Sequence, residues 1–373
     1  MCMNWNYIER KIIRKLHLGG LCYKVLDLLQ GEDKVTNYNP KELEEYVSSI
    51  HPDTGGSCLC ENKMEEPSCD LQIIVPVYNV EKYLRECIDS ILNQKTDYTY
   101  HVVVVNDGST DDSRKILNEY STDKRVTIIG KENGGLSSAR NEALKKIYGR
   151  YVTFVDSDDR MPQGAIQALM SIAKKNDADI VRGGYSYFRA NGKIIDNKYK
   201  DERVSPFNTA GFAWGMVYKN KIWRNICFPH GYWYEDTNCF IVSLLSNTAY
   251  TISSIVYEYR LNDQGITHIG IGNKKSIDSF YVTRRVLTDI KELGKIDCQE
   301  LYECMLHQLV TNFIRIVDLG NSKLDKAVFL LSCDIIESYF PKMQSKTAFG
   351  KQMEEIIRNR DFKHFRLNSL YRW

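Results

Sequence analysis

Three carboxylates stand close together in Asp156-Ser157-Asp158-Asp159, directly after the apolar residues 151–155. Carboxylates at this spacing repel one another unless a cation or nearby bases neutralise them. Mg²⁺ and Mn²⁺ prefer oxygen ligands, commonly a few carboxylates together with substrate phosphates and water. The segment therefore indicates a divalent-cation site for a substrate that carries a diphosphate. The alternative is an acidic turn in solvent.

Two further segments have the composition of ligand-binding turns. Residues 75–79 contain a proline, a tyrosine and an asparagine, which could form the wall of a base-binding pocket. Residues 106–111 read Asn-Asp-Gly-Ser-Thr-Asp, in which Asp107 could accept a hydrogen bond from the imide N–H of a pyrimidine. The same residues form good turns, and Thr110 could cap a following helix, so both explanations stay open for Asp107.

A glycine turn lies between these segments, in residues 132–141. Gly134 and Gly135 would let the main chain pass close to a ligand, and Arg140 could reach a phosphate or hold the acidic segment. Two glycines alone are weak evidence, since any tight turn can use them.

All of these segments follow predicted strands. Short β-branched runs alternate with stretches of helical periodicity, and the runs cover residues 71–77, 101–106, 125–130, 151–155 and 179–183. This βαβ series predicts an α/β domain with a mostly parallel, doubly wound sheet and helices on both faces. Ligands gather at the carboxyl ends of the strands in such sheets, where the polar segments begin.

The regions on either side of the series differ from it. An amphipathic helix is predicted at about 5–30, and the polar stretch that follows is interpreted as a linker or irregular flap. Helical spacing covers residues 274–294, 298–318, 323–340 and 348–360. The predicted organisation is a helical extension and linker at 1–70, an α/β domain at 71–272 and a helical C-terminal domain at 273–373.

The composition of the 373 residues excludes several classes of protein. Hydrophobic residues make up 43% and charged residues 26%, as in an ordinary folded protein. The net charge is +2, so we expect no nucleic-acid partner. No apolar run approaches the roughly 18 residues of a spanning helix, and the N-terminus lacks the continuous apolar core of a secretory signal. A cytoplasmic location is therefore expected.

The chain has 11 cysteines at irregular spacings. In a reducing compartment most of them should be small buried residues. His51, Cys58, Cys60 and Cys69 could ligate zinc, but their spacing matches no common zinc module.

The order and spacing of the motifs resemble those of inverting family 2 glycosyltransferases with the GT-A fold, of the bacterial surface-polysaccharide type. The resemblance runs from residue 71 to about 184, the expected donor-binding half, and leaves 185–272 as the acceptor half. It implies that Asp107 faces uracil, that Tyr78 lines the base pocket and that Asp158 is the closest metal ligand, with Asp156 nearer the ribose and sugar. The donor-binding residues that it implies are Pro76, Val77, Tyr78, Asn79, Asp107, Gly134, Gly135, Arg140, Asp156, Ser157 and Arg260.

Residues 228–237 resemble the family's Phe-Pro-x-Gly…Glu-Asp segment. The resemblance implies that Asp236 is the general base and that Glu235 binds the acceptor or orients Asp236. Single displacement at an anomeric carbon needs such a carboxylate opposite the departing diphosphate, to take the proton of the acceptor hydroxyl. Alternatively, the two acids only begin the following helix, whose positive end favours them.

Residues 257–268 resemble the family's Tyr-Arg…Ser-Ile-Thr segment, which closes over the diphosphate. Arg260 would bind phosphate, and His268 would complete the metal shell together with Asp156 and Asp158. Gly265 stands where a serine is common, which weakens this assignment, and His268 could equally lie on the surface.

Aromatic residues could receive the acceptor. Trp214 and Trp233 offer indole faces on which a sugar ring could stack, although core packing would explain both. Basic residues are interleaved with apolar and aromatic ones at both ends of the chain, which suits an anionic membrane surface, although such ends also stay in solvent or pack on a partner. Membrane contact would fit a lipid-linked glycan acceptor.

The sequence thus predicts metal-dependent, inverting transfer of a hexose or N-acetylhexosamine from a UDP-sugar to a glycan hydroxyl, with Mn²⁺ or Mg²⁺ as cofactor. The pathway would be capsule, exopolysaccharide or lipopolysaccharide synthesis at the inner face of the plasma membrane, and the chain could form a homo-oligomer. The alternatives are an inactive glycan- or nucleotide-binding module and a nucleotidyltransferase. The latter would need a basic glycine-rich loop near the first strand, which residues 76–79 do not provide.

Overall fold

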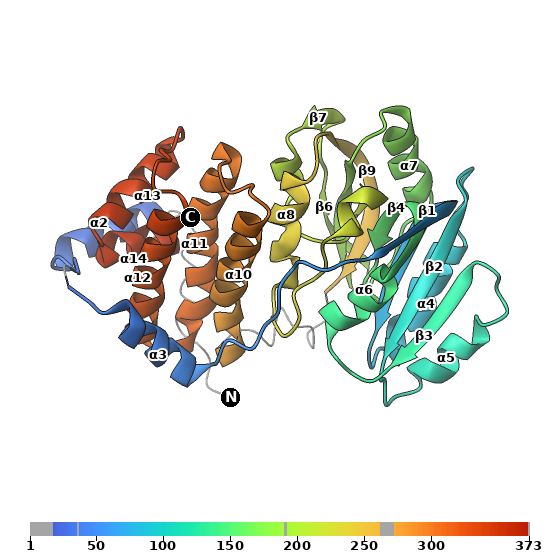
Figure 1. Ribbon diagram of the computed structural model, residues 1–373, viewed down its shortest axis with the longest axis horizontal. Helices are drawn as coiled ribbons and strands as arrows, with labels where there is room; N and C mark the ends of the chain where they lie inside the picture. Colours follow the sequence, from blue (N-terminus) through green and yellow to red (C-terminus); the bar gives the residue numbers. More distant parts are fainter. Residues whose placement is uncertain (1–17, 36, 190–191, 262–271, 372–373) are drawn as a thin grey trace. The chain divides into compact units, whose positions relative to one another are not determined.

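The computed structural model describes residues 18–35, 37–189, 192–261 and 272–371. The chain divides into two compact units (Figure 1). The sheet unit comprises Gly56–Gly231 and Glu235–Asp263, and the helical unit comprises Met1–Gly55, Tyr232–Tyr234 and Gln264–Trp373. The domain boundaries predicted near 70 and 272 stay a prediction.

The described residues of the sheet unit form a nine-stranded sheet in the order β3-β2-β1-β4-β8-β5-β9-β7, with β6 paired to β5. The strands are β1 (Lys63–Val77), β2 (Tyr100–Asp107), β3 (Val126–Lys131), β4 (Lys146–Phe154), β5 (Ile180–Arg189), β6 (Gly192–Asn197), β7 (Glu202–Val204), β8 (Met216–Lys219) and β9 (Ala249–Arg260). The predicted α/β class is confirmed. The sheet is mixed, because β8 runs antiparallel to its neighbours β4 and β5.

Helices cover both faces of β1, and this explains its composition. Ile73 belongs to an apolar cluster with α4 (Glu81–Leu92) and α7 (Ala165–Lys175). The next residue towards the N-terminus, Gln72, points to the other face and donates to the carbonyl oxygen of Ala143 in α6 (Leu136–Leu144). Residues 71–77 are therefore all buried, which is why they read as one apolar run.

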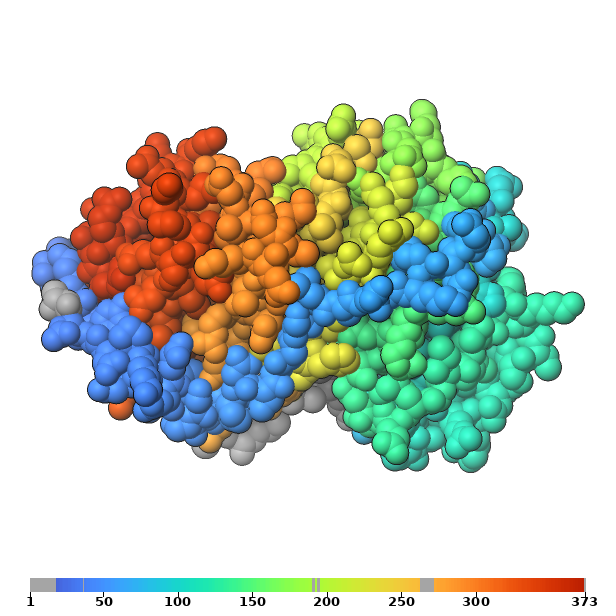
Figure 2. Space-filling view, viewed as in Figure 1, coloured from blue at the N-terminus to red at the C-terminus, as the bar shows by residue number. Residues whose placement is uncertain are grey.

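Two segments before residue 71 differ from the predicted linker. Residues 40–50 form helix α3 (Pro40–Ile50), whose first turn is capped by the Asn39 side chain on the N–H of Lys41. Strand β1 begins at Lys63, and its first residues pair with β4 while they remain partly exposed (Figure 2). Because these strand residues are mostly polar, the apolar pattern did not mark them.

The helical unit contains α2 (Gly19–Leu29), α3, α10 (Asp278–Glu292), α11 (Gln299–Ile316), α12 (Ser322–Tyr339), α13 (Ala348–Arg358) and α14 (Phe362–Tyr371) (Figure 1). The predicted C-terminal helices correspond to α10–α13. Part of the predicted basic-aromatic tail is α14, and its Phe365 ring lies 5.2 Å from Phe313 and 4.6 Å from Phe329. Among the described residues, no helix is long and apolar enough to cross a membrane.

Candidate active site

The loops that follow β1 and β2 are joined by hydrogen bonds. The Asn79 side-chain oxygen accepts the N–H of Thr110 at 2.8 Å, and the Asn79 N–H donates to Ser109 Oγ at 3.1 Å. Asn79 adopts a φ of 48°, which asparagine tolerates better than most residues. The two segments predicted to bind the donor base therefore lie together.

Only part of the predicted segment at 76–79 faces outwards. Pro76 and Val77 are buried in β1, and Val77 packs in the apolar cluster. Tyr78 is 51% exposed, so its ring can meet a ligand. Pro76 and Val77 are accordingly strand residues that position Tyr78, the first residue after β1.

Asp107 is 2% exposed, and its carboxylate holds the glycine turn. Its two oxygens accept the N–H groups of Gly134 and Gly135, at distances down to 2.7 Å, and the Lys131 ammonium at 2.7 Å. The sequence reasoning did not identify Lys131 as a partner. The contact between Asp107 and uracil stays a prediction. Thr110 does not cap the helix that follows, because helix α5 (Ser113–Glu119) has Asp112 at its N-cap position and Thr110 bonds Asn79.

Gly108 allows the loop after β2 to approach the glycine turn closely, and Gly134 is crowded within that turn itself. Gly108 has a φ of 72°, and a Cβ added there would lie 2.8 Å from the backbone nitrogen of Asn133. A Cβ on Gly134 would lie 2.5 Å from Ser138 Oγ. Glycine is therefore required at Gly108 because two backbone segments approach each other closely there. A nearby ligand is not needed to explain it.

Arg140 of α6 joins the acidic turn to the predicted base segment. Its Nη2 donates to Asp156 Oδ1 at 2.7 Å, and its Nη1 donates to Glu235 Oε1 at 2.8 Å. Burial of the guanidinium opposes its charge, but the carboxylates of Asp156 and Glu235 raise the pKa of Arg140. Its Nε is buried and has no hydrogen-bond partner among the described residues. Of the two predicted roles for Arg140, the structure contains the contact with the acidic segment.

The neighbouring Asn141 fixes the segment that leads to the predicted base. Its side-chain nitrogen donates to the carbonyl oxygen of Phe228 at 2.7 Å, and its side-chain oxygen accepts the Phe228 N–H at 2.8 Å. Glu235 and Asp236 lie seven and eight residues further on, in the short helical turn Glu235–Asn238. The sequence analysis gave Asn141 no role, although it stands beside Arg140 in the same motif.

The acidic turn after β4 is held from β9. Asp159 is 1% exposed, and its carboxylate accepts the hydroxyl of Tyr257 and the N–H of Arg260, both at 2.7 Å. Burial raises the pKa of Asp159, and the nearby charges of Asp158 and Asp156 add to this effect. Asp159 is thus an internal anchor, whereas Asp156 and Asp158 are only partly buried. Ser157, between them, is buried.

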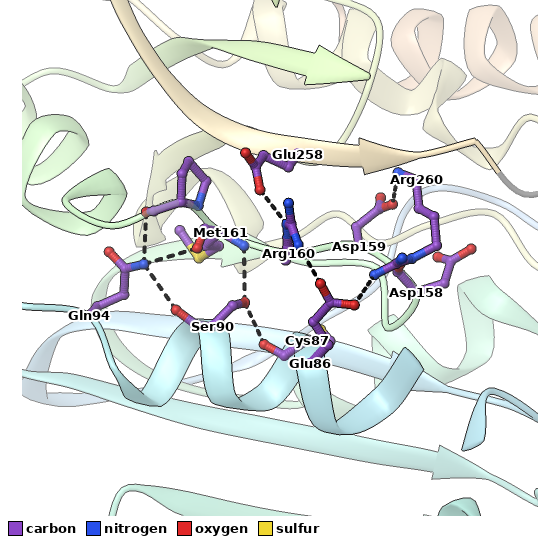
Figure 3. A network of polar contacts seen from close by, with 11 residues as sticks. Glu86, Cys87, Ser90, Gln94, Asp158, Asp159, Arg160, Met161, Glu258 and Arg260 are labelled. Carbon is purple, nitrogen blue, oxygen red and sulfur yellow. Dashed lines mark hydrogen bonds and ion pairs between the residues drawn. The ribbon is translucent and has the colours of Figure 1, made fainter. Parts of the chain in front are cut away.

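Arg260 contacts the acidic turn with its side chain as well. Its Nε donates to the carbonyl oxygen of Asp158 at 2.6 Å, and its Nη2 contacts Glu86 of α4 (Figure 3). The structure therefore places Arg260 beside Asp158, where the resemblance implies the diphosphate. The sequence offered no signal for Glu86, which is one of several charged residues on an amphipathic helix.

The two predicted acceptor residues differ in their surroundings. Trp214 is 6% exposed and lies in a stack between Phe212 and Tyr257, with ring centroids 4.4 Å away on each side. It packs as a core residue. Trp233 is only partly buried, and its backbone N–H donates to Asp278 within the helical unit at 2.8 Å. The acceptor roles of both tryptophans stay predictions.

Asp156 and Asp158 could supply some, but not all, of the oxygen ligands of a hard divalent cation. Two partly exposed carboxylates suit Mg²⁺ or Mn²⁺ if a diphosphate supplies further oxygens. Among the described residues, no group of three or more His, Cys, Asp and Glu side chains is placed to hold a metal ion. The residues His51, Cys58, Cys60 and Cys69 therefore do not form such a group. The third predicted ligand, His268, lies outside the described residues.

Comparison with known proteins agrees with these features. Residues 72–230 match the model of the family described as Glycosyl transferase family 2. The chain is 37% identical over 221 residues to glycosyltransferase GlyA of Streptococcus pneumoniae serotype 4, an alignment that covers 53% of this chain and 32% of GlyA. It is 32% identical over 219 residues to the minor teichoic acid biosynthesis protein GgaB of Bacillus subtilis, covering 52% of this chain and 23% of GgaB.

Solved structures show the same fold. The crystal structure of S. aureus TarS 1–349 in complex with UDP-GlcNAc matches with a TM-score of 0.64 and 22% identity, and it covers 81% of this chain and 91% of that one. The predicted GT-A-like α/β sheet and helical C-terminal region are therefore confirmed. With the motifs in the family's order along this sheet, residues 72–230 are a glycosyl transferase family 2 domain.

Proposed function

We propose that this chain transfers a hexose or N-acetylhexosamine from a UDP-sugar to a hydroxyl group of a bacterial cell-surface glycan, with inversion at the anomeric carbon. The observation that carries the proposal is the position of Arg140, which bonds both Asp156 of the acidic turn and Glu235 beside Asp236. It joins the segment proposed for the donor to the one proposed for the base. The similarity to GgaB, a minor teichoic acid biosynthesis protein, supports a surface glycan, and the similarity to TarS, which was solved with UDP-GlcNAc, supports a UDP-sugar.

The proposed mechanism is a single displacement. The Asp236 carboxylate takes the proton of the acceptor hydroxyl as its oxygen attacks the anomeric carbon, and the bond to the UDP diphosphate breaks on the opposite side. Glu235, held by Arg140, orients the acceptor or Asp236. Asp158 and Asp156 would hold Mg²⁺ or Mn²⁺, which would offset the charge on the departing diphosphate.

Slow hydrolysis without acceptor tests the donor class. The protein is incubated with Mn²⁺ and a panel of nucleotide sugars, and release of the nucleoside diphosphate is followed. Release from a UDP-sugar alone supports the proposal. Release from another nucleotide sugar would reassign the donor, and binding without any release or transfer would indicate an inactive binding module.

Asp158→Ala should abolish turnover and remove the enhancement of UDP binding by Mn²⁺, because Asp158 is the proposed metal ligand beneath the diphosphate. Calorimetry of UDP binding with and without Mn²⁺ measures the second effect directly. Asp112→Ala, which removes an exposed carboxylate paired with Lys115, is the matched control. Unchanged metal-dependent UDP affinity in Asp158→Ala would refute the assignment.

Helix α2 supports a proposed contact with the membrane. Leu21, Val25, Leu28 and Leu29 form a stripe along one side of the helix and are 60%, 46%, 88% and 76% exposed. The opposite side packs on α14, where a Cβ added to Gly19 would lie 2.3 Å from the Tyr371 carbonyl oxygen. The sequence just before the helix has four basic residues within 10–15, so an anionic lipid surface is the occupant that we propose.

This contact predicts cosedimentation with vesicles that contain phosphatidylglycerol at low salt. The double variant Leu21→Ser/Leu28→Ser should reduce the bound fraction at least fivefold, since each inserted leucine contributes roughly 1.5–3 kcal/mol. Added salt should reduce it as well. Ile195→Ser, which changes an exposed side chain of β6, is the control. If the intact protein ignores anionic vesicles at low salt, membrane contact is excluded.

A further inference from the structure

Glu86 of α4 bridges two arginines that come from different parts of the sheet unit. One of its carboxylate oxygens contacts Arg160, just after the acidic turn, and the other contacts Arg260 at the end of β9 (Figure 3). Arg160 also contacts Glu258 of β9. Partial burial opposes ionisation of Glu86, but the two guanidinium groups lower its pKa. Glu86 is therefore a carboxylate that holds two cations together.

The two guanidinium groups that Glu86 bonds also pack on one aromatic ring. Their central carbons are 4.1 Å (Arg160) and 4.3 Å (Arg260) from the centroid of the same ring, Phe188. Two like charges that share one ring repel each other, and a carboxylate between them offsets that repulsion. Without the Glu86 charge, Arg260 would lose its charge-assisted bond at Nη2, and Glu258 alone would offset the charge of Arg160.

The position of Arg260 matters because of its contact with the acidic turn. Its Nε bonds the carbonyl oxygen of Asp158, and its N–H bonds the carboxylate of Asp159. A guanidinium in this place binds a diphosphate well only if its direction is fixed beforehand. Glu86 supplies the bond on the Nη2 side of the same guanidinium.

We infer that Glu86 is a positioning residue for the donor diphosphate: it holds the Arg260 guanidinium beside Asp158 in the direction in which it binds phosphate oxygens. This inference rests on the proposed function, in which a nucleoside diphosphate lies at the acidic turn. Glu86 itself is an anion and would repel the diphosphate, so it acts only through Arg260. Its loss should accordingly weaken the diphosphate contact and leave the contact with the base unchanged.

The test compares Glu86→Gln, which keeps the size of the side chain and removes its charge, with the wild type. Calorimetry in the presence of Mn²⁺ measures the affinity for UDP, and competition against UDP measures the affinity for uridine. We expect the Kd for UDP to rise about tenfold, as for loss of one charge-assisted hydrogen bond, and the Kd for uridine to stay the same. A purely structural role would change both affinities together.

A matched control is available on the same helix. Arg85, next to Glu86, pairs with Glu119 at the surface, where the two side chains are 54% and 51% exposed. Glu119→Gln removes one charge from this pair and should change neither affinity. Glu86→Asp, which keeps the charge on a shorter side chain, should recover part of the UDP affinity and serves if Glu86→Gln folds poorly.

Non-additivity identifies the residue through which Glu86 acts. In an Arg260→Gln background, Glu86→Gln should add no further loss of UDP affinity. A full further loss there, or equal losses for UDP and uridine in the single variant, would overturn the inference. If the wild type binds a different nucleoside diphosphate in the donor panel, the UDP-sugar assignment fails, and the same variants are compared with that diphosphate and its nucleoside.

Discussion

Asp236→Asn should lower the rate of sugar transfer by roughly 10²–10⁴ while donor binding survives, because asparagine keeps the shape and hydrogen-bonding reach of aspartate but cannot accept the proton. Asp236 lies in the helical turn Glu235–Asn238, one residue after the glutamate that Arg140 holds. Transfer is measured with the donor found in the panel and a glycan acceptor, and donor affinity is measured by calorimetry. Binding and chemistry should therefore separate in this variant.

The same change on an exposed aspartate gives the control. Asp177 pairs with Lys219, its side chain is 82% exposed, and its φ of 47° suits asparagine, so Asp177→Asn should transfer sugar at the native rate. Near-native transfer by Asp236→Asn would assign the base elsewhere, with Glu235 next in line. A product with the donor's own anomeric configuration would contradict single displacement altogether.

Arg140→Met should lower the free energy of unfolding by about 3–5 kcal/mol, the usual cost of removing one partner of a buried ion pair. The Arg140 side chain is 3% exposed, and its removal would leave the Asp156 and Glu235 carboxylates without their shared cation. Methionine fills most of the volume beside Phe228, whose ring lies 4.9 Å from the guanidinium carbon. The loss should therefore come mainly from charge rather than from a cavity.

Urea unfolding measures this effect, and Arg85→Met is its control. The Arg85 pair with Glu119 is half-exposed, so its loss should cost about 0–1 kcal/mol. A cost below about 1 kcal/mol for Arg140→Met would mean that the three charges are not a structural unit. Sugar transfer should also fall in Arg140→Met, since Glu235 loses the contact that orients it.

The local hydrophobic pattern of the sequence predicted those strands whose residues are all in the same environment. Residues 71–77 are buried on both faces, so their apolar run marked a strand, and the turns after the strands were marked by glycine and aspartate. Helix α14 shows the opposite case. Its Phe362 and Phe365 pack inside the helical unit, but basic residues between them resemble a surface tail in the sequence.

Contacts between distant residues could not be predicted in this way. Arg140 was a candidate for a phosphate or for the acidic segment, and only the fold decides between partners 16 and 95 residues away. Glu86 meets Arg260 across 174 residues, and no spacing rule connects two such positions. Trp214 shows why an aromatic residue is ambiguous, since stacking against Tyr257 uses the same ring face as stacking against a sugar.

The division of the chain into units has a consequence for exchanging parts between relatives. Tyr232–Tyr234, directly before Glu235, belongs to the helical unit, where Tyr232 donates to Asp53 at 2.6 Å and the Arg315 guanidinium lies 3.8 Å from the Tyr234 ring. A chimaera joined at one point, near residue 263, would keep Tyr232 with Asp53 but would replace the segment that carries Arg315, the partner of Tyr234. Recombination that preserves the segment proposed to carry the base must therefore carry residues 1–55, 232–234 and 264–373 together.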